Sequence, residues 1–521
     1  MFLSGVKQLG FRMQIARLGT LTGKVETHQD VIKTGHRETD VGQYEKARSF
    51  DTIPGPKGVP VFGTLFQYTR GPYSVDFYPD ALVDRYYKYG PIFKETIAGK
   101  TIVHIFDPDE IKKLYATEGK NPHIPPLLET VKMYRKYRDM SPGLGNVNGE
   151  EWYRLRSSVQ KLIMQPVSTA KFLPMVNEVV DDFITRIYKI RASMGEINNF
   201  NFELSKFVYE SSTYTCFEKR QRILNDEKGS HTDKLISCNR AMLDLSTKLK
   251  FQLPFYKYIN TPTWKKLVAS EDFFYRFGQT LVDETVVKMN ELSESGDLKN
   301  GQYVFLSYLL GKRELRYKDL SIVTLSMFND GLSTTAPSLV WQLYCISKHP
   351  EKQEKLYEEV KDLSEKSEPI SAKTLTRLPY LKACIKEGFR LFPIAPDVTR
   401  EPTKDIVISG YQIPKGTYLS LNNNLLLRLP EFFSEPNAYK PERWIRGDST
   451  DPIHPYVVLP FGHGTRMCVG RRVAEQEMYV MLIKLLQHFK IEWNSCEEMG
   501  RKYRTLFTPS TEAKFKFIPR E

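Results

Sequence analysis

The stretch Phe461-Gly462-His463-Gly464-Thr465-Arg466-Met467-Cys468-Val469-Gly470, with the helically spaced run 471–489 that follows it, decides which fold we expect. Three glycines let this backbone turn tightly and approach a flat ligand closely. The sequence places Cys468 at the start of a helix, where unpaired backbone amides and the positive end of the helix dipole favour a thiolate over a thiol. The stretch therefore predicts a cysteine thiolate in a tight loop.

Two other interpretations of Cys468 are open from the residues alone. A lone cysteine is usually a small buried apolar residue. Cys468 with His463 also suggests zinc, but zinc takes four ligands and no second Cys or His pair lies nearby in the sequence. The frame of glycines around Cys468 favours a functional thiolate over both.

The remaining chain has the composition of an ordinary folded protein, with 41% apolar and 26% charged residues. Helical spacing dominates from about Pro79, and short β-rich pieces at 102–106, 406–411 and 417–421 lie between turn signals. The restricted segment 53–58, with two prolines and two glycines, predicts a non-helical entry. We expect a mainly α fold with small β-sheets, in a single domain over residues 49–521.

The net charge indicates which kinds of partner to expect, and the cysteine content indicates the redox state of the compartment. Lysine plus arginine number 75 against 62 acids, a net charge of +13 that attracts acidic partners. No zinc-finger spacing or aromatic-rich RNA-binding signature accompanies this charge, so the sequence argues against nucleic acid. The six cysteines are scattered through the chain, as in a protein of a reducing compartment.

Residues 1–24 contain four basic groups and no acid, with apolar residues between them. This pattern is typical of an amphipathic mitochondrial transit peptide; the alternative is a disordered basic tail. We expect residues 1–48 to be a transit peptide followed by a polar spacer. No apolar run in the sequence reaches the roughly 18 to 20 residues that a membrane-spanning helix needs.

Residues 251–264 interleave aromatic and basic groups and precede Lys265 and Lys266. Such a segment can lie at a membrane interface, with apolar side chains inserted and lysines near lipid phosphates. The alternative is a loop packed on the core. Peripheral membrane association is therefore an expectation of the sequence.

The stretch 461–470 resembles the haem-binding signature of the cytochrome P-450 family, Phe-x-x-Gly-x-Arg-x-Cys-x-Gly, and the resemblance extends over the chain from about residue 50. It implies the cytochrome P-450 fold, haem b (iron protoporphyrin IX) as cofactor, and Cys468 as the iron ligand. It also implies that Arg466 pairs with a haem propionate, with Phe461 and Gly470 as cofactor contacts. Thiolate ligation favours cleavage of a bound O–O bond, so hydroxylation with O2 is the implied reaction.

Two further motifs match the family. Glu387 and Arg390 lie three apart in the helical run 381–391; alone they read as a solvated surface pair. In the family this pair is buried and completes a structural triad with the arginine of a later motif, here Arg443 in Tyr-Lys-Pro-Glu-Arg-Trp at 439–444.

Trp152 and Arg156 have one-turn spacing and are suited to hold a propionate, although a surface helix has the same spacing. With the haem signature present we favour propionate binding. Arg400, in Thr399-Arg400-Glu401, is a further candidate propionate partner by resemblance.

The oxygen-activation helix departs from the family pattern Ala-Gly-x-Asp/Glu-Thr-Thr. This chain has Asp330-Gly331-Leu332-Ser333-Thr334-Thr335, so Ser333 replaces the acid before Thr334. Asp330 lies one turn before Thr334 on the same helical face. We expect Asp330 to relay protons to Thr334 or to hold a polar group of the substrate; the alternative is a solvated acid.

Four basic residues resemble those with which mitochondrial family members receive a small acidic [2Fe-2S] ferredoxin: Lys382, Lys386, Arg471 and Arg472. Complementary charge there would raise the association rate and weaken with salt. The alternative is a generic basic surface. A location on the matrix side of the mitochondrial inner membrane follows from the transit-like start and the ferredoxin face.

The resemblance thus implies a monooxygenase that uses O2, with NADPH electrons passed through ferredoxin reductase and ferredoxin, to hydroxylate an apolar steroid-like, sterol-like or foreign molecule. A haem-thiolate isomerase or dehydratase without external electrons, and a haem-binding sensor or carrier, are the alternatives. The missing acid before Thr334 permits the first of these, and the predicted ferredoxin face argues against it.

Overall fold

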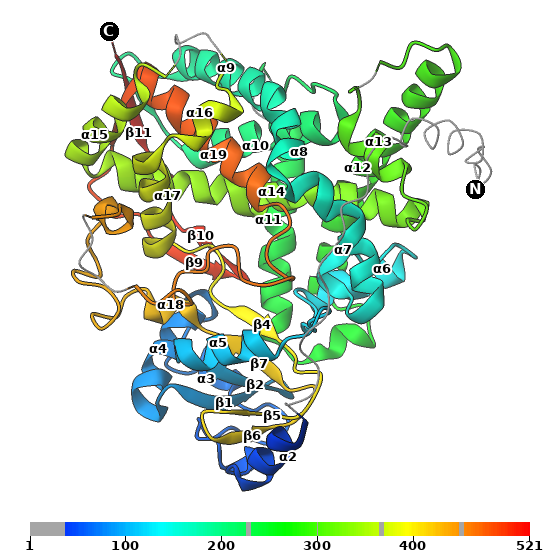
Figure 1. Cartoon of the computed structure of the whole chain (residues 1–521), viewed down its shortest axis with the longest axis vertical. Coiled ribbons are helices and arrows are strands. Elements are labelled where there is room, and N and C mark those ends of the chain that lie inside the picture. Colours follow the sequence, from blue (N-terminus) through cyan, green and yellow to red (C-terminus); the bar gives the residue numbers. More distant parts are fainter. Residues whose placement is uncertain (1–36, 226–230, 300, 364–368, 448–452, 521) are drawn as a thin grey trace.

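The computed structural model describes residues 37–225, 231–299, 301–363, 369–447 and 453–520. Figure 1 shows a large helical part around α14 and a smaller end that contains β1, β2 and β4–β7. The predicted class, mainly α with small sheets, is confirmed. The basic segment 1–24 lies outside the described residues.

The element bounds are as follows. The helices are α2 (Arg37–Lys46), α3 (Leu65–Thr69), α4 (Tyr78–Tyr89), α5 (Pro108–Thr117), α6 (Glu129–Tyr137), α7 (Gly149–Met164), α8 (Pro166–Thr169), α9 (Leu173–Ile190), α10 (Phe200–Phe217), α11 (His231–Lys250), α12 (Pro262–Glu294), α13 (Val304–Leu310), α14 (Tyr317–Ser347), α15 (Pro350–Val360), α16 (Ala372–Thr376), α17 (Pro379–Leu391), α18 (Asn423–Leu426) and α19 (Arg471–His488). The strands are β1 (Ile92–Ile97), β2 (Lys100–Ile105), β3 (Glu196–Ile197), β4 (Val398–Arg400), β5 (Ile406–Ile408), β6 (Tyr411–Ile413), β7 (Tyr418–Leu421), β8 (Phe489–Trp493), β9 (Arg501–Arg504), β10 (Leu506–Pro509) and β11 (Phe515–Pro519).

The main sheet has the strand order β1-β2-β7-β4. The β1–β2 turn uses Ala98 and Gly99, both at positive φ (49° and 81°), as a two-residue hairpin turn requires. Strand β7 runs parallel to β2 and pairs antiparallel with β4. This arrangement brings Arg400, at the end of β4, and Tyr418, at the start of β7, to the helical part of the molecule.

Helix α14 is the central element of the helical part. Over its 31 residues most side chains are buried, and it packs against α10, α12 and α17. The Trp341 ring stacks on Phe392 with centroids 4.4 Å apart. Pro337 lies inside the helix, and because proline lacks an N–H, the carbonyl of Ser333 loses its intrahelical donor.

A buried carboxylate ties α17 to the segment 434–444. Arg390 donates from Nε and one terminal nitrogen to the two oxygens of Glu387, at 2.9 and 2.8 Å. Arg443 donates to the same carboxylate at 3.1 Å, and the indole N–H of Trp444 does so at 3.0 Å. All three members of the sequence-predicted triad are buried and in contact.

The N-terminal part of the described chain attaches to the β5–β6 hairpin. The backbone of Arg48 bonds to Gly410 and Gln412, and its guanidinium lies 3.7 Å from the centre of the Tyr411 ring. Arg48, next to the expected domain boundary at residue 49, is thus in contact with this hairpin. The segment 53–58 is non-helical, as predicted.

Candidate active site

A cavity of about 440 Å³ lies between α14, the loop 459–470 and β4. The predicted residues that it brings together lie up to 140 positions apart in the sequence, from Asp330 to Gly470. The sequence-predicted residues that line it are Asp330, Thr334, Arg400, Phe461, Arg466, Cys468 and Gly470. Apolar surface dominates the lining, as in pockets for small apolar molecules.

The loop that carries Cys468 is closed by its own backbone. The amide of Cys468 donates to the carbonyl of Phe461 at 2.8 Å, and that of Met467 donates to Gly464 at 3.1 Å. Gly462 and Gly464 have φ of 71° and 74°, a backbone conformation that favours glycine. The glycines thus serve the tight turn that the sequence predicted.

The position of Cys468 relative to the helix corrects one expectation. Helix α19 begins at Arg471, so Cys468 precedes it by three residues instead of standing at its start. The amides of Gly470 and Arg471 nevertheless hydrogen-bond to the sulfur and lower its pKa, while burial raises the pKa of the thiol more strongly. The side chain faces the cavity. A cation at the sulfur would stabilise the thiolate against that desolvation.

Three guanidinium groups gather beside Cys468. Arg466 donates to the carbonyls of Pro122 and Val147 and stacks on Trp152, with 4.2 Å from guanidinium carbon to ring centre. Arg400 pairs with Glu118. Arg156, on α7 one turn after Trp152, is buried and contacts Met164 Sδ at 3.1 Å.

The charges of this cluster are not balanced among the described residues. Burial, and then the charges of Arg400 and Arg156, lower the pKa of Arg466 to about 9; burial lowers that of Arg156 to about 10. Three guanidinium groups face one carboxylate, that of Glu118, which leaves an excess of two positive charges. A ligand with two carboxylates would remove this penalty.

On α14, Asp330 and Thr334 face the cavity whereas Ser333 does not. Thr334 Oγ1 donates to the carbonyl of Asp330 at 2.8 Å. Burial raises the pKa of Asp330 to about 6, and the charge of Arg135 and a hydrogen bond from Asn329 oppose this rise. Ser333 is buried against α11.

Sequence reasoning missed two residues of this cavity region. Arg135, on α6, is buried and donates to the phenol oxygen of Tyr275 at 2.9 Å and to the carbonyl of Pro142 at 2.7 Å. Lys250 ends α11 and lines the cavity. In the sequence both read as ordinary surface cations, Lys250 as a helix C-terminal lysine, so no local signal distinguished them.

The four basic residues of the predicted ferredoxin face have different neighbours. Much of Lys386 is exposed, but its ammonium lies 3.9 Å from the centre of the Trp444 ring. Partial desolvation of the ammonium, and then the charge of Arg471, lower its pKa. Lys382 donates to the carbonyl of Thr376 at 3.0 Å. Arg472 instead donates to the carbonyl of Met164, at the end of α7.

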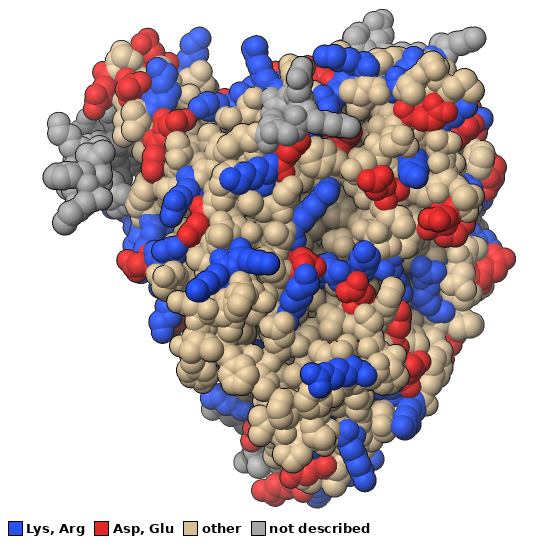
Figure 2. Space-filling view, turned by 180° about the vertical axis from the view of Figure 1, so that it is seen from behind, with Lys and Arg blue, Asp and Glu red and all other residues tan. Residues whose placement is uncertain are grey.

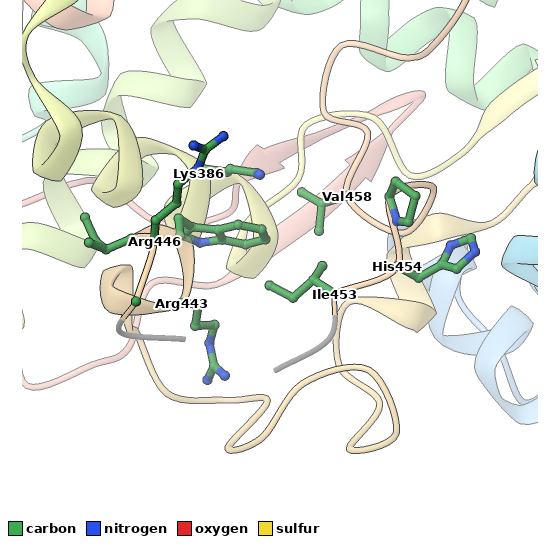
Figure 3. Close-up of a pocket in the computed structure, with 10 residues that line it drawn as sticks. Lys386, Arg443, Arg446, Ile453, His454 and Val458 are labelled. Carbon is green, nitrogen blue, oxygen red and sulfur yellow. The ribbon is translucent and has the colours of Figure 1, made fainter. Parts of the chain in front are cut away.

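A second pocket of about 450 Å³ adjoins Lys386. Figure 3 shows Arg443, Arg446, Ile453, His454 and Val458 around it. On the face shown in Figure 2, basic and acidic side chains are interspersed over most of the surface. Arg446 therefore lines a pocket next to one of the predicted docking lysines, whereas the guanidinium of Arg443 is already paired with Glu387.

Comparison with known proteins agrees with this geometry. The family model for "Cytochrome P450" matches residues 53–517. A probable cytochrome P450 of Caenorhabditis elegans is 38% identical over 479 residues, covering 90% of this chain and 94% of that protein. The mitochondrial sterol 26-hydroxylase of Mus musculus is 32% identical over 481 residues, covering 90% of each chain.

A third relative, the mitochondrial 1,25-dihydroxyvitamin D(3) 24-hydroxylase of Mus musculus, is 30% identical over 477 residues, covering 91% of this chain and 90% of that protein. Haem b, the cofactor of this family, carries two propionates, which match the two excess positive charges beside Cys468. Cys468 contributes its sulfur to the lining of the cavity, three residues before the start of α19. The chain belongs to the cytochrome P450 family of haem-dependent monooxygenases.

Proposed function

We propose that this protein hydroxylates an apolar, sterol-like or foreign molecule in mitochondria, with electrons delivered from NADPH through ferredoxin reductase and a [2Fe-2S] ferredoxin. The observation that carries the proposal is the Cys468 side chain facing a largely apolar cavity beside an uncompensated cluster of arginines. Haem b bound there would activate O2 and insert one of its oxygen atoms into a C–H bond.

Each group of the chain has a defined part in this proposal. The sulfur of Cys468 would ligate the iron, and the amides of Gly470 and Arg471 would stabilise its negative charge. Arg156, Arg400 and Arg466 would hold the two propionates, with the Trp152 ring stacked on the Arg466 guanidinium. Glu387, Arg390 and Arg443 keep α17 and the following loop in place.

The first prediction concerns Cys468. In the dithionite-reduced protein exposed to carbon monoxide, the wild type should give a strongly red-shifted Soret band, because thiolate donates electron density to the iron. Cys468→Ser should lose that band and its hydroxylation activity. Wild-type protein that binds haem without the shifted band would refute the ligand assignment and favour a haem sensor or carrier.

Proton supply is assigned to Asp330 and Thr334. Two protons are consumed when one oxygen atom of O2 leaves as water, and a general acid near neutral pKa is suited to deliver them. The Asp330 carboxyl faces the cavity with a pKa of about 6, and Thr334 Oγ1 is one turn away on the same helix. An acid within the cavity also supports oxygen reduction over the alternative of an isomerase or dehydratase.

Asp330→Asn should lower product formed per NADPH by about tenfold or more, since the general acid is lost. Ser333→Ala is the matched control on the same helix and should leave this ratio unchanged. The carboxyl is protonated below pH 6 and ionised above it, so wild-type coupling should fall as pH rises through 6 and the variant should lack that step. Equal coupling and equal substrate affinity in Asp330→Asn and wild type would end this assignment.

Electron delivery is assigned to the surface around Lys386 and Arg471, which lie close enough for their charges to interact. Phe461, in the Cys468 loop, lies beneath Arg471 with its ring centre 5.5 Å from the guanidinium. An acidic ferredoxin that docks here would be near the iron ligand. The pocket of Figure 3 adjoins the same surface.

Lys386→Gln should raise the KM for ferredoxin about tenfold at low ionic strength, and high salt should reduce the difference because it screens exposed charges. Lys415→Gln, an exposed lysine on the β-rich end, is the control with the same change of charge. The haem spectrum of both variants should match the wild type. A KM that is unaltered by Lys386→Gln at every salt concentration would contradict this docking site.

Membrane contact is assigned to the loop before α12. Phe255, Tyr258 and Ile259 are 58%, 84% and 63% exposed, and the adjacent Lys265 and Lys266 are exposed as well. Other aromatic residues of 251–264 pack in the core: Phe251, Tyr256 and Trp264. Among the described residues, no helix has both the length and the apolar content to span a membrane.

The double substitution Phe255→Ser and Ile259→Ser should weaken cosedimentation with phosphatidylcholine–cardiolipin vesicles by at least about tenfold, because each inserted side chain contributes roughly 1.5–3 kcal/mol. Val167→Ser with Met194→Ser, which changes exposed apolar residues elsewhere, should leave binding intact. If both double variants sediment like the wild type, this loop is not the membrane contact.

A further inference from the structure

The active-site cavity contains an ammonium group that the proposed reaction does not use. Lys250 is the last residue of α11, and its accessible surface faces the same cavity as Cys468. Among the described residues, no carboxylate lies within ion-pair distance of its Nζ atom. A charge that faces an apolar cavity without a counter-ion is costly, so its position calls for a ligand.

Aromatic groups hold the Lys250 side chain in place. Its Nζ donates to the phenol oxygen of Tyr503 at 2.8 Å and lies 5.3 Å from the centre of the Tyr78 ring. Burial lowers the pKa of Lys250, but its interactions with Tyr503, Tyr418 and Asp397 outweigh this effect and leave the pKa above its ordinary value. The group therefore stays charged at neutral pH.

The surroundings of Lys250 are more positive than negative. Asp397 lines the cavity and its negative charge raises the pKa of Lys250, but its carboxylate lies beyond ion-pair distance of the ammonium and accepts a hydrogen bond from Ser420. Lys100 lies near Lys250, and its pKa falls to about 8 through burial and the charges of Lys257 and Lys250. Glu129 pairs with both Lys100 and Lys257. This part of the cavity thus favours an anion.

Lys250 and Cys468 have different neighbours in the wall of the cavity. The groups that act on Lys250 come from β4, β7 and β9, namely Asp397 just before β4, Tyr418 and Tyr503. Those that act on Cys468 are Asp330, Arg156 and the first residues around α19. No residue is shared by the two sets. A molecule fixed at Lys250 would therefore present a distant carbon to the reactive centre.

We infer that Lys250 binds the carboxylate of an elongated apolar acid, so that the preferred substrate of this enzyme is a steroid or fatty-chain carboxylate oxidised at a carbon remote from its acid group. Tyr503 supports the ammonium, and the apolar lining takes the body of the molecule. This inference rests on the proposed function for its reaction, while the binding preference can be measured independently.

The test is a titration of the oxidised haem protein, followed by the change in the Soret band as each probe binds. The steroid probes are cholanate, methyl cholanate and the corresponding alcohol; the chain probes are dodecanoate, methyl dodecanoate and dodecanol. Wild type should bind at least one carboxylate about tenfold more tightly than its ester and alcohol, as a charge-assisted hydrogen bond provides. The two series distinguish a steroid body from a straight chain.

Lys250→Met, which keeps the length and apolar stem, should lose the carboxylate preference and bind the esters as wild type does. Lys250→Arg should restore the preference. Lys248→Met is the matched control, because Lys248 is exposed near the same helix end and pairs with Asp244. Equal thermal unfolding and equal carbon-monoxide spectra of all variants exclude misfolding.

Two outcomes overturn the inference. In the first, the wild type prefers the alcohol or the ester, or its Soret band responds to none of the six probes. In the second, Lys250→Met keeps the carboxylate preference. Preference for the alcohol would instead indicate a hydroxyl held jointly by Lys250 and Asp397. A Lys250-dependent carboxylate preference without hydroxylated product in the reconstituted system would refute the proposed function and leave the binding site intact.

Discussion

The structure depends first on the buried carboxylate of Glu387. It accepts hydrogen bonds from Arg390, Arg443 and the indole of Trp444, and removal of any one cation would leave charge uncompensated in the core. The effect reaches the active site through α17, because the Phe389 ring packs edge-on against Phe461 with centroids 5.4 Å apart. The loop that presents Cys468 is thus supported by a charge cluster on the far side of the helix.

The second constraint is the uneven distribution of charge around the cavity. Arg466, beside Cys468, is held by the Trp152 ring and by carbonyl dipoles, and Lys250 is held by aromatic side chains; such groups orient a cation without neutralising it. Such groups are expensive to bury, and a ligand with complementary anions recovers that cost. The same physical reasoning therefore applies to the propionates at Arg466 and to the acid group that we infer at Lys250.

The sequence predicts best those features whose physics is local. The glycine turns around Cys468, the helix that follows them, and the one-turn pairs Glu387–Arg390 and Trp152–Arg156 all depend on neighbours within a few residues. The helix after the loop begins at Arg471, as predicted, but Cys468 stands three residues before it because the Cys468 amide bonds back to Phe461 and does not enter the helix. Arg135 and Lys250 could not be found, since their partners Tyr275 and Tyr503 lie 140 and 253 positions away.

The departure from the family pattern on α14 also has a geometric explanation. With 3.6 residues per turn, Asp330 lies about 40° from Thr334 around the helix axis, whereas Ser333 is rotated by about 100°. Ser333 contacts Asn239 on α11, so an acid at that position would be buried against another helix. Asp330 lies on the cavity side, within the field of Arg135. Asp330 therefore places an acid on the face of α14 that carries Thr334, which position 333 of this chain does not share.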